Sequence, residues 1–300
     1  MATSTIPPRA TTYGQFTPQN MRRRQIVNLI MIGIVAFCAL IIIIPLVHIL
    51  GVCLVEGASS LNLNLFIKAP APPGVAGGGI APAIVGSIIM LAIASVLGIP
   101  TGVATGIYMA EYGTRSNRYA SIVRFVADIL LGVPSIVIGI FVWTLLVRPF
   151  GSFSALAGGF ALGAMMIPTI SRTTEEVVRL VPQTIREASL ALGIPYWKTV
   201  WRIVIPAASS GIGTAIVLAF ARVGGETAPL LFTTLGNNFL SFNILRPMDA
   251  VPLRLFNYAI GPYEEWHRIA WATAFVLVIA ILLLTIAVRR IARGRFNDGV

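Results

Sequence analysis

Residues 211–231 read GIGTAIVLAFARVGGETAPLL, and this stretch decides the class of the protein. Its first ten residues are apolar or small enough for lipid, yet Arg222 and Glu226 follow within the same segment. A charged side chain at the centre of a bilayer costs about 3 to 15 kcal/mol unless it is hydrated, paired or shielded. The segment therefore predicts a membrane helix whose two charges either serve a function or form a structural pair.

The composition of the whole chain supports the same class. Of its 300 residues, 56% are hydrophobic and only 11% are charged, whereas soluble domains are about 25% charged. The sequence therefore predicts an integral membrane protein. Its formal net charge of +11 would suggest nucleic acid in a soluble protein. Here the basic residues gather at the ends of apolar segments, which indicates membrane orientation and no nucleic-acid partner.

Six segments are long enough to cross a hydrocarbon core, which takes about 20 helical residues. They are predicted at 26–54, 80–110, 121–147, 152–177, 207–235 and 267–289. The first is much longer than the apolar core of a signal peptide, so we interpret it as an uncleaved span. The predicted fold class is an all-α membrane protein with six transmembrane helices. We expect a cytosolic N-terminal tail at 1–24, a transmembrane domain at 25–292 and a cytosolic tail at 293–300.

The basic residues predict the orientation of these spans. With six spans, most of them fall on one side of the membrane, and Arg222 remains inside it. The crowded side has Arg9, Arg22, Arg23, Arg24, Arg115, Arg118, Arg124, Arg172, Arg179, Arg186, Lys198, Arg202, Arg289, Arg290, Arg293 and Arg295. The other side has Lys68, Arg148, Arg246, Arg254 and Arg268. Because Lys and Arg are enriched in cytoplasmic loops, both termini are predicted to be cytoplasmic.

The sequence shows little sign of a catalytic centre. It has no GxxxxGK[ST] phosphate loop, and no HExxH or Cys/His cluster accompanies His48 and His267. Cys38 and Cys53 lie about four helical turns apart, too far for a disulfide within one helix. We therefore expect no cofactor, no metal and no ATPase site in this chain. Any energy for work must come from a partner protein or an ion gradient.

A second informative stretch is RLVPQTIREASLALGIPYWKTVWRIVIPAA, at 179–208 in the predicted cytoplasmic loop. Pro182 can open a short helix there, and Gly193 can close it in the left-handed conformation. Pro195 can open a second helix, which Pro206 is expected to end before the fifth span begins. The loop is therefore predicted to contain two short helices.

The first of these helices has a small-residue, mostly apolar surface, with Arg186 and Glu187 available for charged contacts. The segment is similar to the cytoplasmic signature of ABC-importer permeases, E-A-A-x3-G-x9-I-x-L-P. The signature positions are Glu187, Ala188, Ser189 (for the second alanine), Gly193, Ile203, Ile205 (for leucine) and Pro206. The resemblance implies a type I ABC importer permease fold and docking of the loop at about 181–206 on a cytoplasmic ATP-binding subunit. The alternative is an ordinary amphipathic interfacial helix pair.

Three further stretches resemble the A-type permeases of phosphate-specific ABC importers. They are ARVGGETAPLLFTTLGNNF at 221–239, PPGVAGGGIAPAIVGS at 72–87 and DILLGVPSIVIGIF at 128–141. This resemblance implies an ATP-driven inorganic phosphate importer in the bacterial inner membrane. It also implies three protein partners besides membrane lipid: the ATP-binding subunit, a second, C-type permease and an external phosphate-binding protein.

The chemistry of the charged segment suits an oxyanion path. The Arg222 guanidinium offers a fork of donors that matches two phosphate oxygens. Glu226 lies four residues later, so it can pair with Arg222 in an empty path if the helix is continuous. Gly224 and Gly225 loosen that helix, and Thr227 can offer a hydroxyl. The family resemblance implicates the arginine in phosphate passage.

Asp128 is the other acidic residue at membrane depth, where it can pair with Arg124 or gate the inner mouth of the path. Pro134 is expected to kink the same span. Other functions remain open at this point. The charges can belong to a proton-coupled secondary oxyanion transporter that uses Arg222, Glu226 and Asp128. The protein can also be a channel, or the Arg–Glu pair can simply hold subunits together.

Overall fold

The computed structural model describes residues 18–75, 77–113 and 117–297, and every regular element in these ranges is a helix. The predicted tail at 1–24 therefore lies mostly outside the described residues. The chain divides into two units, Met1–Val52 and Cys53–Val300. The first unit holds most of helix α1 (Pro18–Ser59), which contains the first predicted span.

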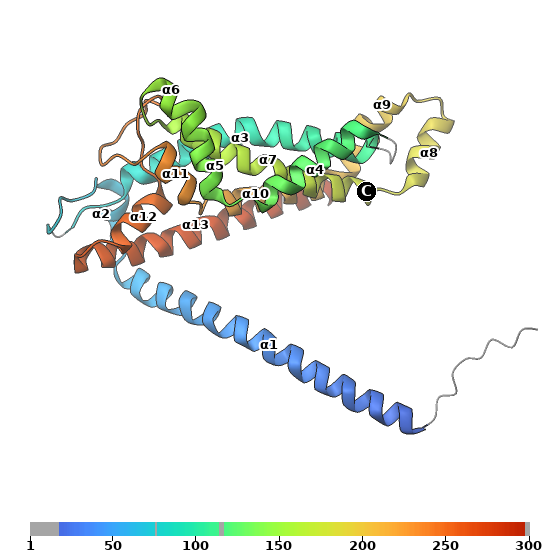
Figure 1. Ribbon diagram of the computed structural model, residues 1–300, viewed down its shortest axis with the longest axis horizontal. Coiled ribbons are helices and arrows are strands. Elements are labelled where there is room, and N and C mark those ends of the chain that lie inside the picture. The colour runs from blue at the N-terminus through green and yellow to red at the C-terminus, as the bar shows by residue number, and fades with distance from the viewer. Residues whose placement is uncertain (1–17, 76, 114–116, 298–300) are drawn as a thin grey trace, which may run out of the picture. The chain divides into compact units, whose positions relative to one another are not determined.

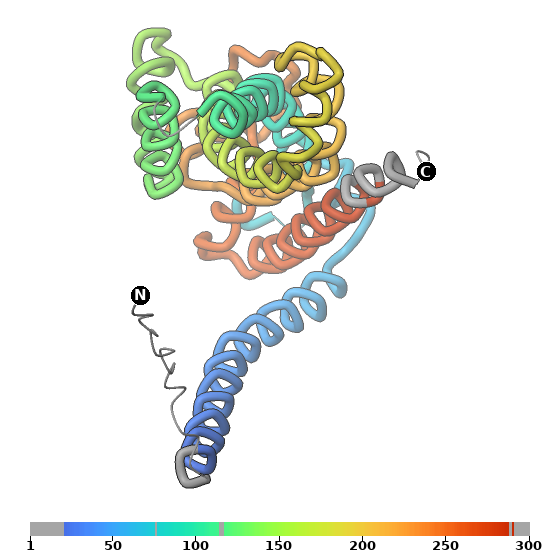
Figure 2. Tube along the Cα trace, turned by 90° about the vertical axis from the view of Figure 1, so that its right-hand side faces the viewer, coloured from blue at the N-terminus to red at the C-terminus, as the bar shows by residue number. Residues whose placement is uncertain are grey.

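Three long helices form the centre of the second unit: α3 (Ala81–Ile107), α7 (Ala155–Arg179) and α10 (Ile205–Val223). They lie next to one another in Figure 1, and Figure 2 shows them nearly end-on. Small residues let α3 and α7 approach closely, as is typical of membrane helix packing. A Cβ atom added to Gly98 would lie 2.7 Å from the Cβ of Met166. The main apolar core surrounds this contact.

The third predicted span is broken rather than kinked. It consists of α4 (Arg118–Gly132) and α5 (Ser135–Val142), which continues into η2 (Trp143–Val147) and α6 (Arg148–Phe150). The two halves are bent by 107°. Pro134 causes the break, because it lacks an N–H and forces Val133 into an extended conformation, with φ −70° and ψ 129°. Among the described residues, five helices are long and apolar enough to cross a membrane by themselves, and the broken pair makes a sixth if it counts as one span.

The fifth predicted span has different ends from those expected. A continuous helix runs over Tyr196–Val223, formed by α9 (Tyr196–Thr199), the π-helical turn η3 (Val200–Val204) and α10. Pro206 does not end a loop helix as predicted. The reason is that the π turn widens the helix just before the proline, and the N–H of Ile205 bonds the Val200 carbonyl five residues back.

The remaining helices mark the two ends of the second unit. Helix α8 (Gln183–Ala191) lies with α9 at one end, whereas α2 (Leu63–Ile67), α6 and α12 (Val251–Ala259) lie at the other (Figure 1). Two further helices are the short α11 (Ala228–Thr233) and the long α13 (Glu264–Asn297). A π-helical turn, η1 (Tyr108–Tyr112), follows directly after α3. Helix α13 continues beyond the predicted end of the transmembrane domain at 292.

Candidate functional site

The charged stretch that opens the sequence argument lies at a helix break. Helix α10 ends at Val223, and the N–H groups of Gly224 and Glu226 close the last turns onto Phe220 (2.8 Å) and Val223 (3.2 Å). Helix α11 starts only at Ala228, with the Thr227 carbonyl accepting from Leu230 at 3.1 Å. The helix was expected to loosen at Gly224 and Gly225, and the structure shows that it is completely interrupted there.

Arg222 and Glu226 therefore do not lie on one continuous helix. Within the residues that the structure describes, neither has an ion-pair partner, so the predicted pair is not formed. The spacing of four brings side chains together only in an unbroken helix. Arg222 is exposed on the surface of the chain, and Glu226 is half-buried. Glu226 lines a crevice of about 10 Å³ with Ser87, Gly224 and Ala250.

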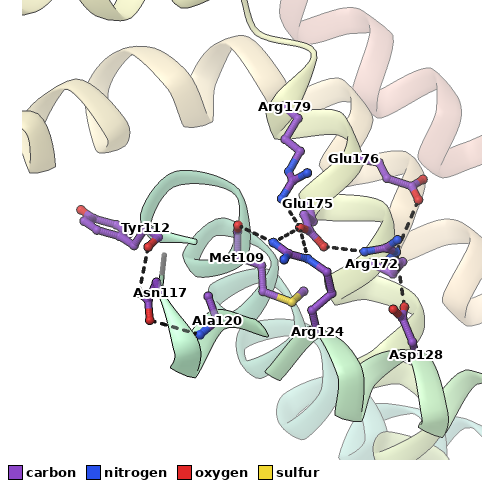
Figure 3. Close-up of polar contacts among 10 residues, drawn as sticks. All are labelled: Met109, Tyr112, Asn117, Ala120, Arg124, Asp128, Arg172, Glu175, Glu176 and Arg179. Carbon is purple, nitrogen blue, oxygen red and sulfur yellow. Dashed lines mark hydrogen bonds and ion pairs between the residues drawn. The ribbon is translucent and has the colours of Figure 1, made fainter. Parts of the chain in front are cut away.

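Asp128 is not paired with Arg124. Its carboxylate lies 3.5 Å from the Nε atom of Arg172 on α7 (Figure 3). Arg124 instead donates to Glu175 at 2.8 Å and to the Met109 carbonyl at 3.3 Å. On α4, residues 124 and 128 are one turn apart, but Arg124 turns toward the buried carboxylate on α7.

Glu175 is the centre of this cluster, and sequence reasoning missed it. Its side chain is 1% exposed, and three guanidinium groups surround it. They belong to Arg124 (2.7 Å), Arg172 (2.9 Å) and Arg179 (2.6 Å), as Figure 3 shows. The sequence did carry a signal for this cluster: Glu175 lies three residues after Arg172 and four before Arg179, which is ion-pair spacing on a helix. The cluster joins α4 to the end of α7.

The two-helix loop has the predicted local structure at its turns. Pro182 precedes α8, and Gly193 follows it with φ +74°, the left-handed conformation that glycine adopts without strain. Pro195 precedes α9. The hydroxyl groups of Ser189 and Thr199, both buried, lie 2.8 Å apart and tie the two helices together.

The signature residues of the loop divide into two groups. Glu187, Ala188 and Gly193 are exposed, and so is Pro206 on the long helix. Ser189 is buried, and Ile203 is half-buried. The exposed group faces away from the chain, whereas the others hold its conformation.

Arg186 is not free for outside contacts, contrary to the sequence-based expectation. It is buried against Glu111 of η1, with its Nη2 and Nε atoms 2.6 and 3.2 Å from the two carboxylate oxygens. The Tyr196 hydroxyl donates to the same carboxylate at 2.7 Å. Hydrogen bonding to Glu111 raises the pKa of Arg186 above its ordinary value, so this guanidinium stays charged. No local pattern indicates a pair 75 residues apart.

A further buried pair lies at the opposite end of the unit. The guanidinium of Arg254 on α12 contacts Asp249 at 2.5 Å and Asn238 at 2.6 Å, and Asp249 is 1% exposed. Sequence reasoning placed Arg254 in a loop and did not consider Asp249. The pair fastens the segment before α12 to that helix.

A bundle of membrane-length helices, with an exposed arginine at the end of α10 and a two-helix loop at one end, points to a membrane permease. Residues 102–296 match the family described as "Binding-protein-dependent transport system inner membrane component". The chain is 45% identical over 244 residues to the phosphate transport system permease protein PstA of Yersinia pestis, covering 81% of this chain and 82% of that protein. It is 41% identical over 275 residues to PstA of Haemophilus influenzae, covering 91% and 97%. The chain belongs to the PstA family of phosphate transport permeases.

Two solved structures show the same fold. One is a bacterial ABC transporter involved in the import of the acidic polysaccharide alginate, with a TM-score of 0.59, 11% identity and coverage of 92% of this chain and 98% of that chain. The other is the MetNI methionine ABC transporter in inward-facing conformations, with a TM-score of 0.58, 20% identity and coverage of 72% and 94%.

These findings establish the function at the level of the family. The protein is the multi-pass permease component of a bacterial phosphate ABC transporter, and the ATPase is a separate subunit. A permease of this class works with an ATPase and a binding protein. This assignment displaces the alternative of a proton-coupled secondary transporter.

Proposed function

We propose that Arg222 is the residue of this chain that phosphate passes in the membrane, with Glu226, Thr227 and Asp128 along the same path. The observation that carries the proposal is the exposed Arg222 guanidinium at the end of α10, which has no ion-pair partner within the described residues. An arginine in a membrane segment is costly unless it meets water, a partner or a substrate. A guanidinium fork matches two phosphate oxygens.

The position of Arg222 also supports a second permease subunit. The crevice beside Glu226 has room for about one water molecule, so it cannot hold phosphate within this chain. Arg222 lies on the outer surface of the chain, which supports a path that another membrane subunit covers and closes. We assign that place to a homologous, C-type permease. Glu226 would then weaken the hold of Arg222 on the anion and favour its release.

The loop at 181–206 is proposed to dock on the ATP-binding subunit. Glu187, Ala188 and Gly193 supply exposed contacts, and Ser189 supports them through its buried hydrogen bond. Ile203 and Pro206 belong to the long helix that continues from the loop into the membrane. Movement of the loop would therefore reach α10, whose last turn carries Arg222.

The same proposal orients the protein in the membrane. The end with α8 and α9 faces the cytoplasm, because most of the Lys and Arg residues of the second unit flank it. The end with α2 and α12 faces outward, where the external phosphate-binding protein delivers its ligand. Both termini are assigned to the cytoplasmic side of the bacterial inner membrane.

Phosphate uptake by the assembled complex in proteoliposomes tests the role of Arg222. We expect Arg222→Ala to abolish ATP-driven uptake of labelled phosphate while the subunits still purify together. Arg222→Lys keeps the charge but loses the fork, so it should retain partial uptake. Arg290→Ala, at an exposed arginine near the end of α13, is the matched control and should transport normally. Loss of assembly in Arg222→Ala, or uptake equal to the wild type, contradicts the proposal.

A further inference from the structure

We propose that Glu111 is a positioning residue for energy coupling: its buried carboxylate holds the docking loop to the transmembrane core and transmits the movement of α8. This inference rests on the proposed docking of the loop on the ATP-binding subunit. It adds a residue from the second span, far from the loop in sequence, to the coupling machinery.

The first argument is how little else holds α8. Of its nine residues, only Arg186 and Ser189 are buried. Ser189 reaches the hydroxyl of Thr199, which belongs to the neighbouring loop helix α9. Arg186 reaches Glu111, at the end of α3. Of the two buried side chains of α8, only Arg186 connects the docking helix directly to the membrane-spanning helices, because Ser189 contacts the loop helix α9.

The second argument is the geometry of the connection. Both carboxylate oxygens of Glu111 accept from Arg186, so the pair is bidentate and fixes one orientation. The remaining donors of Arg186 bond the carbonyls of Val178 (3.0 Å) and Val181 (2.5 Å), at the end of α7 and just beyond it. Tyr196, the first residue of the long helix, donates to Glu111 as well. Helices α8 and α9 therefore meet η1 at one carboxylate, and Arg186 links the same site to the end of α7.

The third argument is that η1 is itself fixed to the core on its other side. Arg124 of α4 bonds the carbonyl of Met109 in η1 and the buried carboxylate of Glu175 on α7. A displacement of Arg186 thus cannot be absorbed by η1 alone. It is passed to α3 and, through Arg124, to α4 and α7. The element that carries Glu111 is a π-helical turn, a form often found at functional sites.

Stability alone does not explain a pair of this kind. Replacing a buried ion pair by apolar residues of similar volume is often neutral or stabilising, because both charges lose their hydration. A buried bidentate pair does fix a single relative position of its two helices. That property is what a coupling joint requires.

The test measures phosphate transported per ATP hydrolysed in proteoliposomes that contain the whole complex. Glu111→Gln keeps the shape of the side chain and removes its charge. We expect the complex to assemble and to hydrolyse ATP, with the transport-to-hydrolysis ratio lowered about fivefold or more, the lower end of typical coupling between sites. Glu176→Gln, at an exposed carboxylate on α7, is the control and should keep the wild-type ratio. An unchanged ratio in Glu111→Gln overturns the proposal.

Two additions keep the outcome decisive. Arg186→Lys keeps the charge but loses the bidentate contact, so its ratio should also fall, and it replaces Glu111→Gln if that variant fails to assemble. An unchanged ratio in Arg186→Lys would likewise overturn the proposal.

Docking itself is tested by cross-linking Ala188→Cys to lysines of the ATP-binding subunit, in a chain with Cys38→Ser and Cys53→Ser. Absence of that cross-link with Glu111 intact refutes the docking function, whereas a cross-link with normal coupling in the variants refutes only the role of Glu111.

Discussion

Replacing Glu175 with glutamine removes the one carboxylate that three arginines share at the end of α7. The Glu175 side chain is 1% exposed, whereas those of Arg124, Arg172 and Arg179 are 26%, 34% and 51% exposed. Removing one partner of a fully buried ion pair costs about 3–5 kcal/mol, and an exposed pair contributes about 1 kcal/mol or less. Water can rehydrate the three guanidinium groups, so we expect a loss at the lower end of the buried range, about 3 kcal/mol.

Thermal unfolding of the purified protein in mild detergent measures this loss. At about 2–4 °C for each kcal/mol in a domain of 150–250 residues, the midpoint of Glu175→Gln should fall by about 6 °C or more. The control is Glu176→Gln, whose carboxylate is 66% exposed and has a single contact of 3.6 Å with Arg172. Its midpoint should change by less than about 2 °C. Equal midpoints for the two variants would show that the ion pairs of Glu175 with the three arginines do not stabilise the folded protein. Loss of phosphate uptake at an unchanged midpoint would place Glu175 in the path instead.

Two glycines give further predictions. A Cβ atom at Gly193 would meet no neighbouring atom, so the cost of Gly193→Leu, about 1–2 kcal/mol, comes only from the left-handed backbone. We expect Gly193→Leu to reduce co-purification of the ATPase subunit. Gly193→Asn should not, because asparagine tolerates this conformation. Normal co-purification of the leucine variant would contradict the docking role of this turn. Gly98→Ala should lower the unfolding midpoint, because its Cβ would lie 2.7 Å from that of Met166 and overpacking costs about 1–3 kcal/mol. Gly33→Ala, with open space around it, is the matched control, and an equal response of the two variants would refute the close contact of α3 and α7.

Features set by neighbouring residues were predictable from the sequence. Apolar runs indicated the membrane helices, and Gly193 indicated the end of α8, because each depends on a few consecutive residues. Proline was less informative. Pro134 breaks its span by 107°, whereas Pro206 lies within a continuous helix because a π turn precedes it. The tertiary structure decides which of these two responses occurs, and no local pattern distinguishes them.

The ion pairs were the least predictable part of the site. Arg186 bonds Glu111 75 residues away, and Arg124 bonds Glu175 51 residues away. Local spacing suggested other partners: Asp128 for Arg124, and Glu226 for Arg222. Both suggestions assumed that helical spacing decides pairing. In the structure, a buried carboxylate on another helix competes better for Arg124, and the helix carrying Arg222 ends before Glu226.

The distribution of paired and unpaired arginines bears directly on transport. At the docking end, Arg124 and Arg186 are held by the buried carboxylates of Glu175 and Glu111, which fixes helices relative to one another. Such arginines are poorly suited to bind phosphate, because the anion would have to displace a partner already in place. Arg222, in contrast, is exposed, and no carboxylate of the described residues forms an ion pair with it. An anion can therefore contact Arg222 without breaking the connections that we propose to carry movement from the loop at 181–206. On the roles that we propose for Arg222 and Glu111, this separation would let the same chain bind its substrate loosely and transmit motion rigidly.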